Sequence, residues 1–340
     1  MGTVSVLMGT LQTYAWGRSN GLSTWLPSAP TGPHAELWFG AHPNGPSTVV
    51  EGPAIVSEHA PLLVKLLAAG SPLSIQVHPD AEGVETLQAS PHTAQLLADS
   101  QVKSEVLIAV EEFAVLAGLR ESADAHRVLS AGLSADCAAL AALAEGNRVE
   151  AIRQIFAEQP AFDPQAALAT LSPAERAVME LVVQKYPDDV GLPVSFMMKP
   201  NVVQPGDAMF VRAGCLHAYV DGFGVEVMTS SDNVLRLGLT PKQVAVEPAL
   251  SILKPDLQPE VVSVSDNIAA VTGFPFSVQR ISNGAASVSD AGAIVLCVEG
   301  DAHADCGAVV TAGQAAFLHD GQCTWQVRGT VYVARPTAGM

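Results

Sequence analysis

Short runs of β-branched and aliphatic residues, separated by Pro, Gly and Asn, recur along most of the chain and restrict it to a fold built mainly of short strands. The clearest runs are 47–51, 62–68, 73–78, 106–110, 208–212, 215–220, 277–281, 293–298, 309–310, 315–318 and 331–334. Their spacing and Gly-rich turns favour two jelly-roll β-barrel halves over a doubly wound parallel sheet. No G-x-G-x-x-G follows a strand and no G-x-x-x-x-G-K-[ST] occurs, so neither nucleotide-binding motif is present.

A helical segment interrupts the strands from residue 120 to about residue 186. Ala and Leu dominate it, and Ser172, Pro173 and Glu175 supply an N-cap, a first-turn proline and a capping-box glutamate. We predict about five short helices here, forming a structural insertion or lid, and one or two more within 79–100. The expected domains are a mainly β catalytic domain of residues 1–119 and 187–259, an α-helical insertion of residues 120–186, and a C-terminal β domain of residues 260–340.

Composition and charge exclude several classes of protein. The 340 residues are 49% hydrophobic, which is enough for a large core, and 17 Lys and Arg against 34 Asp and Glu give a formal net charge of −17. That charge repels nucleic acid. No apolar stretch approaches the roughly 20 residues of a membrane span, no secretory signal is evident, and the five cysteines contain no C-x-x-C pair. We expect a cytoplasmic protein with reduced thiols, no nucleic-acid or membrane partner, and no obligate protein partner.

Polar residues within apolar runs point to a metal or to a buried polar network. Ser74, Gln76 and His78 share one face of a predicted strand, where each unpaired polar group costs about 1–3 kcal/mol. Glu105 begins another apolar run, and His217 lies in a later one. One carboxylate, two imidazoles and a carboxamide oxygen would suit zinc or another divalent first-row metal. Hydrogen-bonded core groups without a metal are the alternative.

The densest polar stretch of the chain follows His217. It contains Glu226, Ser230, Ser231, Asp232, Asn233, Arg236, Thr240 and Lys242. A guanidinium and an ammonium beside a metal would hold a sugar phosphate, because the first binds oxygens through its fork and the second acts as a point charge. The alternative is a solvated loop of turn-forming residues.

The segment from His217 to Lys242, HAYVDGFGVEVMTSSDNVLRLGLTPK, resembles the long motif of the type I mannose-6-phosphate isomerases. It departs from that motif at Thr229 and Leu237, where the family usually has alanine. Further likeness lies in YAWG from Tyr14, AELWFGAHP from Ala35 and PLSIQVHP from Pro72, so the resemblance spans residues 10–255. The family's NHKPE appears here as QVKSE at 101–105, which keeps the lysine and the glutamate but not the histidine or the proline.

The resemblance implies two cupin-like barrels with a helical domain, and a zinc-dependent isomerase. The implied reaction interconverts mannose 6-phosphate and fructose 6-phosphate by proton transfer between C1 and C2 through an enediolate. By resemblance, one zinc ion per chain is held by Gln76, His78, Glu105 and His217.

The remaining residues of the family motifs can then be given roles in that reaction. We expect Arg236 to stabilise the developing negative charge, Glu226 and Asp232 to move or orient protons, and Lys103 to serve proton transfer or the phosphate. Ser74 and Lys242 are the phosphate candidates. Trp16, Glu36 and Tyr219 are expected to line the pocket.

Two other functions use the same residues. Two histidines and a carboxylate can form a facial triad on Fe(II), as in a cupin oxygenase, although Gln76 and the cations Arg236 and Lys242 argue against it. A cupin that binds a sugar phosphate without converting it is the second alternative.

Overall fold

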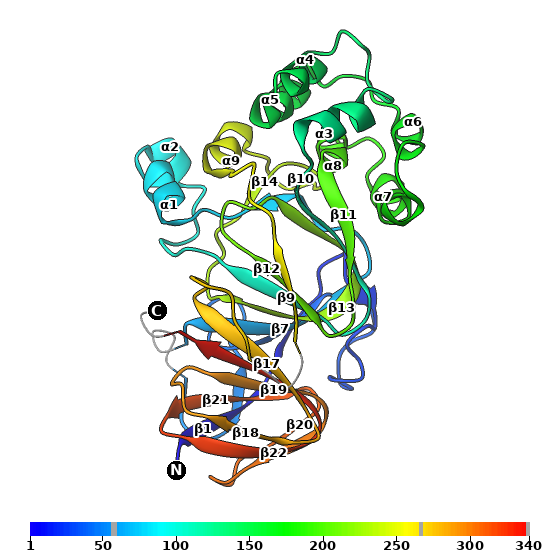
Figure 1. Cartoon of the computed structure of the whole chain (residues 1–340). Coiled ribbons are helices and arrows are strands. Elements are labelled where there is room, and N and C mark those ends of the chain that lie inside the picture. Colours follow the sequence, from blue (N-terminus) through cyan, green and yellow to red (C-terminus); the bar gives the residue numbers. More distant parts are fainter. Residues whose placement is uncertain (56–59, 265–267, 338–340) are drawn as a thin grey trace.

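The computed structural model describes residues 1–55, 60–264 and 268–337. Figure 1 shows two large antiparallel sheets stacked along the molecule, with the helices gathered at one end and the N-terminus at the other. The mainly β architecture with a helical insertion that the sequence predicts is confirmed. No helix in the described ranges is both long and apolar enough to cross a membrane.

The first sheet carries the candidate site. Its main path runs β15 (Glu260–Ser263), β12 (Asp207–Val211), β9 (Glu105–Ala109), β13 (His217–Thr229), β7 (Leu62–Ala69), β5 (Glu36–Phe39) and β2 (Thr10–Gln12). Beside this path, β10 (Phe113–Leu119) joins β13 to β11 (Met198–Val203), and β8 (Gln76–Val77) joins β13 to β14 (Leu235–Arg236). The 73–78 run is thus a strand over only two residues.

The second sheet combines strands from both ends of the chain. Its path is β16 (Ile268–Ala269), β17 (Phe276–Ser282), β22 (Cys323–Pro336), β19 (Ile294–Ala304), β21 (Gln314–Asp320), β1 (Thr3–Met8) and β6 (Thr48–Glu51). In addition, β18 (Ala285–Val288) pairs with β22 and β20 (Val309–Thr311) with β19, while β3 (Arg18–Ser19) and β4 (Pro33–His34) form a separate hairpin. Because β1 and β6 pair here, the strand pairing crosses the domain border that we predicted.

Side-chain alternation divides the first sheet into a core face and a site face. Along β7, Leu62, Val64, Leu66 and Ala68 enter an apolar cluster that also contains Leu296, Phe317 and Tyr332 of the second sheet. The intervening residues, including Lys65, therefore point to the opposite face. The same period places Val106 and Ile108 of β9 in the core and turns Glu105 away from it. Burial between the sheets thus fixes which charged residues face the site.

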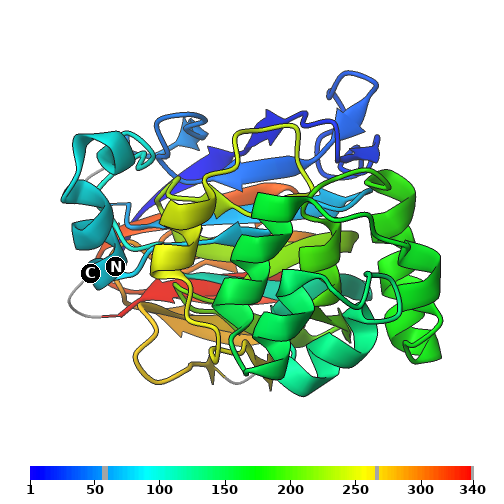
Figure 2. The same ribbon diagram turned by 90° about the horizontal axis from the view of Figure 1, so that it is seen from above.

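Helices cover the far end of the first sheet, as the view in Figure 2 shows from above. The segment 120–186 contains α3 (Ser122–Leu129), α4 (Ala138–Ala144), α5 (Arg148–Glu158), α6 (Pro164–Leu168) and α7 (Pro173–Lys185), and the 79–100 stretch contains α1 (Ala81–Gln88) and α2 (Pro91–Ala94). Ser172 and Glu175 form the predicted capping box of α7.

Two further helices were not predicted, because we expected only strands after residue 187. They are α8 (Leu192–Phe196) and α9 (Val246–Ile252). All five residues of α8 are buried, so its sequence has no polar face from which a helical period could be recognised.

Arg120 ties the start of the insertion to its last long helix. Its side chain is 5% exposed and donates hydrogen bonds to Asp124 and to Glu175, both at 2.7 Å. Replacing Arg120 by methionine should lower the free energy of unfolding by about 1–2 kcal/mol in urea denaturation, a moderate loss because both carboxylates are partly exposed. The control is Arg127→Met, since Arg127 also pairs with Asp124 but is itself exposed. Equal losses in the two variants would contradict this role.

Candidate active site

Four strands place charged side chains on the site face of the first sheet. Glu226 on β13 lies directly opposite Lys65 on β7, and Met228 opposite Glu105 on β9. Trp38 of β5 is the other cross-strand partner of Lys65. The register of the antiparallel strands therefore brings residues that are far apart in the sequence to neighbouring positions.

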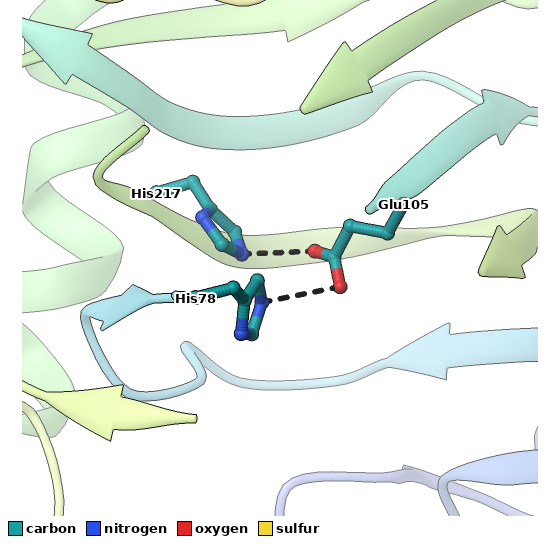
Figure 3. Close-up of side chains that lie close together, drawn as sticks. All are labelled: His78, Glu105 and His217. Atoms are coloured by element: carbon teal, nitrogen blue, oxygen red, sulfur yellow. Dashed lines mark ion pairs between the residues drawn. The ribbon is translucent and has the colours of Figure 1, made fainter. Parts of the chain in front are cut away.

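His78, Glu105 and His217 converge as a candidate metal centre (Figure 3). All three are buried, and one potential ligand atom from each lies within 4.8 Å of the others. The Nε2 atom of His217 is 2.8 Å from Oε1 of Glu105, and Nε2 of His78 is 3.3 Å from Oε2. Two ligand atoms on one tetrahedral zinc ion are about 3.3 Å apart for bonds of about 2.0 Å, so the His78 pair already has this separation and the His217 pair must open by only about 0.5 Å.

The hydrogen bonds of the two imidazoles leave their Nε2 atoms directed at the carboxylate. Nδ1 of His78 donates to the carbonyl oxygen of Asn233 at 2.7 Å, and Nδ1 of His217 to that of Cys215 at 3.1 Å. Burial lowers the pKa of His78 to about 4, and the charge of Lys103 adds to the effect, so this ring is neutral at pH 7. Its buried Nε2 makes no hydrogen bond within the described chain. A lone pair facing a carboxylate oxygen suits a divalent cation between them.

Glu105 is the anion of this centre. Burial alone would raise its pKa, but the charge of Lys103 and the hydrogen bond from His217 outweigh burial and hold the pKa well below its usual range. The ammonium of Lys103 lies 3.2 Å from Oε2, and the hydroxyl of Tyr219 donates to Oε1 at 3.0 Å. These contacts keep the carboxylate ionised and fix its orientation.

Lys65 is a buried site residue that our sequence reasoning missed. Its ammonium lies 2.6 Å from Glu226 and 3.3 Å from Glu36, and 5.2 Å from the ring centre of Trp38. Burial would lower the pKa of Lys65, but the two carboxylates outweigh burial and raise it. The signal was available in the sequence, because a single lysine inside the run LLVKLLAA must be charge-paired if that run is a buried strand.

An open cavity of about 750 Å³ lies beside the metal centre. The predicted residues that line it are Trp16, Glu36, Ser74, Gln76, Lys103, Asp232, Arg236 and Lys242. Two predicted residues lie deeper: Glu226 is buried against Lys65, and Tyr219 contacts Glu105 instead of lining the pocket. The end of the helical insertion contributes Lys185, and the residues just after it contribute Asp188 and Asp189, none of which we predicted.

Two cations at one side of the cavity are suited to an anion. Arg236 is half-buried and pairs through its backbone with Gln76, which also pairs with His217. Burial lowers the pKa of Arg236, and burial together with the charge of Arg236 lowers the pKa of Lys242. A bound anion would relieve this repulsion.

Around Asn233 the polar stretch after His217 is a buried network, whereas Lys242 at its end is exposed. The amide of Asn233 accepts hydrogen bonds from the backbone N–H groups of Ala98 and Asp99 and donates to the carbonyl oxygens of Asp99 and Gln101. Asn233 thereby holds the segment that leads to Lys103.

Two departures from the motifs of the resembled family contact each other. The hydroxyl of Thr229 donates to the carbonyl oxygen of Val102 at 2.8 Å and accepts from the backbone N–H of Ser104 at 3.2 Å. A proline at 104 has no N–H to donate, and an alanine at 229 has no hydroxyl to accept it. The two changes therefore act together to hold the backbone that carries Lys103 and Glu105.

The fold and the site define a mainly β protein with a buried site suited to a divalent metal, next to a cavity whose lining includes the cations Arg236 and Lys242. The family described as "Phosphomannose isomerase type I, catalytic domain" matches residues 4–60 and 53–122. Mannose-6-phosphate isomerase of Salmonella typhimurium is 29% identical over 97% of this chain and 98% of its own length, and that of Schizosaccharomyces pombe is 30% identical over 68% and 69%. The chain belongs to the type I phosphomannose isomerase family.

Solved structures agree with this assignment. A crystal structure of zinc-bound mannose 6-phosphate isomerase matches with a TM-score of 0.80 at 26% identity, over 99% of this chain and 100% of its own. A variant of phosphomannose isomerase from Salmonella typhimurium matches with a TM-score of 0.81 at 25% identity, over 98% of this chain and 100% of its own.

Proposed function

We propose that this protein is a zinc-dependent isomerase that interconverts mannose 6-phosphate and fructose 6-phosphate. The observation that carries the proposal is the neutral, buried His78, whose unpaired Nε2 faces Glu105 beside His217. Family membership and the zinc-bound structural relative support the choice of metal and reaction. Gln76 completes the proposed ligand set.

The zinc ion would supply a Lewis acid that polarises a substrate oxygen. Arg236 lines the same cavity, and its guanidinium would stabilise the negative charge that develops on the enediolate. Asp232 and Lys103 line the cavity, whereas Glu226 is buried and its charge is balanced by Lys65. We therefore assign proton transfer at the substrate carbons to Asp232 and Lys103. Tyr219 and Glu226 would then orient Glu105 and Lys65.

Lys242 and Ser74 would hold the phosphate. The ammonium of Lys242 lies 5.7 Å from the ring centre of Tyr14, which stacks on Trp16 at the edge of the cavity. An ammonium on this rim can bind the phosphate at a distance from the reacting carbons, which anchors the sugar without taking part in proton transfer.

Asp189 connects the helical insertion to this phosphate end. Its Oδ1 atom accepts hydrogen bonds from the backbone N–H groups of Gly191 and Leu239, at 2.8 and 2.9 Å, and its Oδ2 accepts from Thr240 at 3.1 Å. Leu239 has a φ of 54°, a backbone conformation that such contacts must stabilise. Asp189 therefore holds the turn that leads to Lys242.

We expect Asp189→Asn to raise the KM for mannose 6-phosphate about 5- to 20-fold with little change in kcat. The amide would turn a donor toward the N–H of Thr240 and loosen the turn, at a cost of about 1–2 kcal/mol. Steady-state kinetics measure the effect. Asp188→Asn is the control, because Asp188 lines the same cavity and carries the same charge but is exposed. A loss of kcat at unchanged KM in Asp189→Asn would contradict the positioning role.

The function is tested by a coupled assay for fructose 6-phosphate, run without oxygen on protein of measured metal content. We expect turnover that disappears on chelation and returns with zinc. Turnover that needs oxygen and Fe(II) would instead support an oxygenase. Zinc-loaded protein that binds mannose 6-phosphate without exchanging the C2 proton with solvent would support a binding protein.

A further inference from the structure

Two cysteines meet on the second sheet, at the opposite end of the molecule from the helices. Cys323 begins β22, and Cys306 lies in the turn that connects β19 to β20. The β19–β22 pairing ends with Ala304 opposite Trp325, and the N–H of Asp305 continues it by donating to the carbonyl oxygen of Thr324 at 3.0 Å. The next residues on each side are Cys306 and Cys323, so the strand register places the two side chains opposite each other.

The thiols are in direct contact. The thiol of Cys323 donates to the sulfur of Cys306 across 3.0 Å. The carboxylate of Asp305 is close enough to form a third potential ligand with both sulfurs. The two thiols could therefore serve in one of two ways: they could bind a metal ion together with Asp305, or they could form a disulfide bond with each other.

The sulfur separation decides between the two. Two thiolates on one tetrahedral zinc ion lie about 3.8 Å apart, because each Zn–S bond is about 2.3 Å long. The observed 3.0 Å is shorter than that and must close by only about 1 Å to reach a disulfide bond. The carboxylate of Asp305 is also already engaged, since its Oδ1 accepts the backbone N–H of Thr324.

The exposure of the two sulfurs sets the order of reaction. Of the five cysteines, all within the described ranges, Cys306 is the one that is not buried. Burial raises the pKa of the Cys323 thiol to about 11, so Cys323 remains protonated while Cys306 meets a reagent from solvent. The other three cysteines are buried.

We propose that Cys306 and Cys323 are a dithiol modification site that low-molecular-weight disulfides oxidise to an intramolecular disulfide. The Cys306 thiolate attacks a sulfur of the reagent, forms a mixed disulfide and releases one reagent thiol. The sulfur of Cys323 then loses its proton, attacks the Cys306 sulfur and displaces the second reagent thiol. Two electrons pass from the two cysteines to the reagent, which is reduced to two thiols.

The bond would close a chain segment between residues 17 positions apart and fasten the β19–β20 turn to β22. Restricting that loop in the unfolded chain raises the midpoint of thermal unfolding by about 4 °C. The metal centre lies on the first sheet, so kcat and KM stay unchanged. The modification thus changes the lifetime of the folded enzyme and not its rate.

The test incubates the zinc-loaded protein with oxidised glutathione, then unfolds it in guanidinium chloride containing N-ethylmaleimide so that every remaining thiol is alkylated, and maps peptides without reduction. We expect three of the five cysteines to be alkylated, since two are consumed, together with a peptide pair joined through Cys306 and Cys323. The thermal midpoint should rise, and dithiothreitol should reverse the rise. Five alkylated cysteines, a glutathione adduct that persists on Cys306, or a different pair would overturn the proposal.

Two variants separate the disulfide from other effects. Cys306→Ser should leave four alkylated cysteines and no thermal shift. Cys297→Ser is the matched control on the same sheet, because a hydroxyl can take over the hydrogen bonds of that sulfur to the carbonyl oxygens of Glu299 and Gly300, and it should retain the shift. A second zinc ion in the untreated protein that Cys306→Ser loses would show a metal site instead, and would also overturn the proposal.

Discussion

Replacing His217 by alanine is expected to remove the bound zinc and to lower kcat for mannose 6-phosphate on the order of 1000-fold. The imidazole is one of three buried groups that converge at the candidate metal centre, and its loss leaves Oε1 of Glu105 without its 2.8 Å partner. A carboxylate and one remaining imidazole hold a divalent ion far more weakly than the complete set. Zinc content after gel filtration and the coupled assay measure the two effects.

The control for this variant is His303→Ala. His303 is half exposed on the second sheet and pairs with Asp301, so its removal should leave zinc content and kcat unchanged. A zinc content in His217→Ala equal to that of the unmodified protein would refute the role of His217 as a ligand.

Arg236→Ala, in contrast, should retain zinc and lose only activity, with kcat reduced about 100- to 1000-fold. Arg236 lines the cavity, and burial already lowers its pKa, so its charge is poorly solvated and available to a substrate oxygen. Removing one donor to a developing oxyanion commonly costs a factor of this size. Within the described ranges, Arg236 forms no ion pair with the residues of the candidate metal centre, so we expect the zinc content to be unchanged.

Two comparisons sharpen the result. Lys242→Ala should mainly raise KM, because we assign Lys242 to the phosphate and not to the reacting carbons. Arg236→Lys should recover part of kcat, because it restores the charge without the planar fork. Full kcat in Arg236→Ala, or a loss of zinc from it, would contradict the assignment to charge stabilisation.

The sequence was sufficient to predict the architecture and much of the site. Short strands interrupted by an Ala- and Leu-rich segment gave the mainly β fold with its helical insertion, and the capping box marked the start of α7 correctly. The convergence of His78, Glu105 and His217 followed from the types of side chain within apolar runs and from the family motif. Two histidines and a glutamate inside apolar runs are unusual unless they bind a metal or form a buried polar network, which is why they could be identified.

The features that could not be predicted depend on contacts between residues far apart in the sequence. Lys65 and Glu226 are 161 residues apart, and only the register between β7 and β13 brings them together. Tyr219 could not be assigned to Glu105 without knowing which face of β13 it occupies. The bond between Thr229 and Ser104 also depends on tertiary packing, although both positions stood out as departures from the family motifs.

The pairing of β1 with β21 sets the order in which the protein can fold. Thr3 lies opposite Asp320, so this contact spans nearly the whole chain and closes late, because distant pairing requires a large loss of chain entropy. The first sheet, whose strands lie closer in sequence, can assemble while β1 still lacks β21. During synthesis, Leu7 and its neighbours are therefore exposed until β21 emerges, and truncation that removes β21 would leave this apolar strand edge open to aggregation.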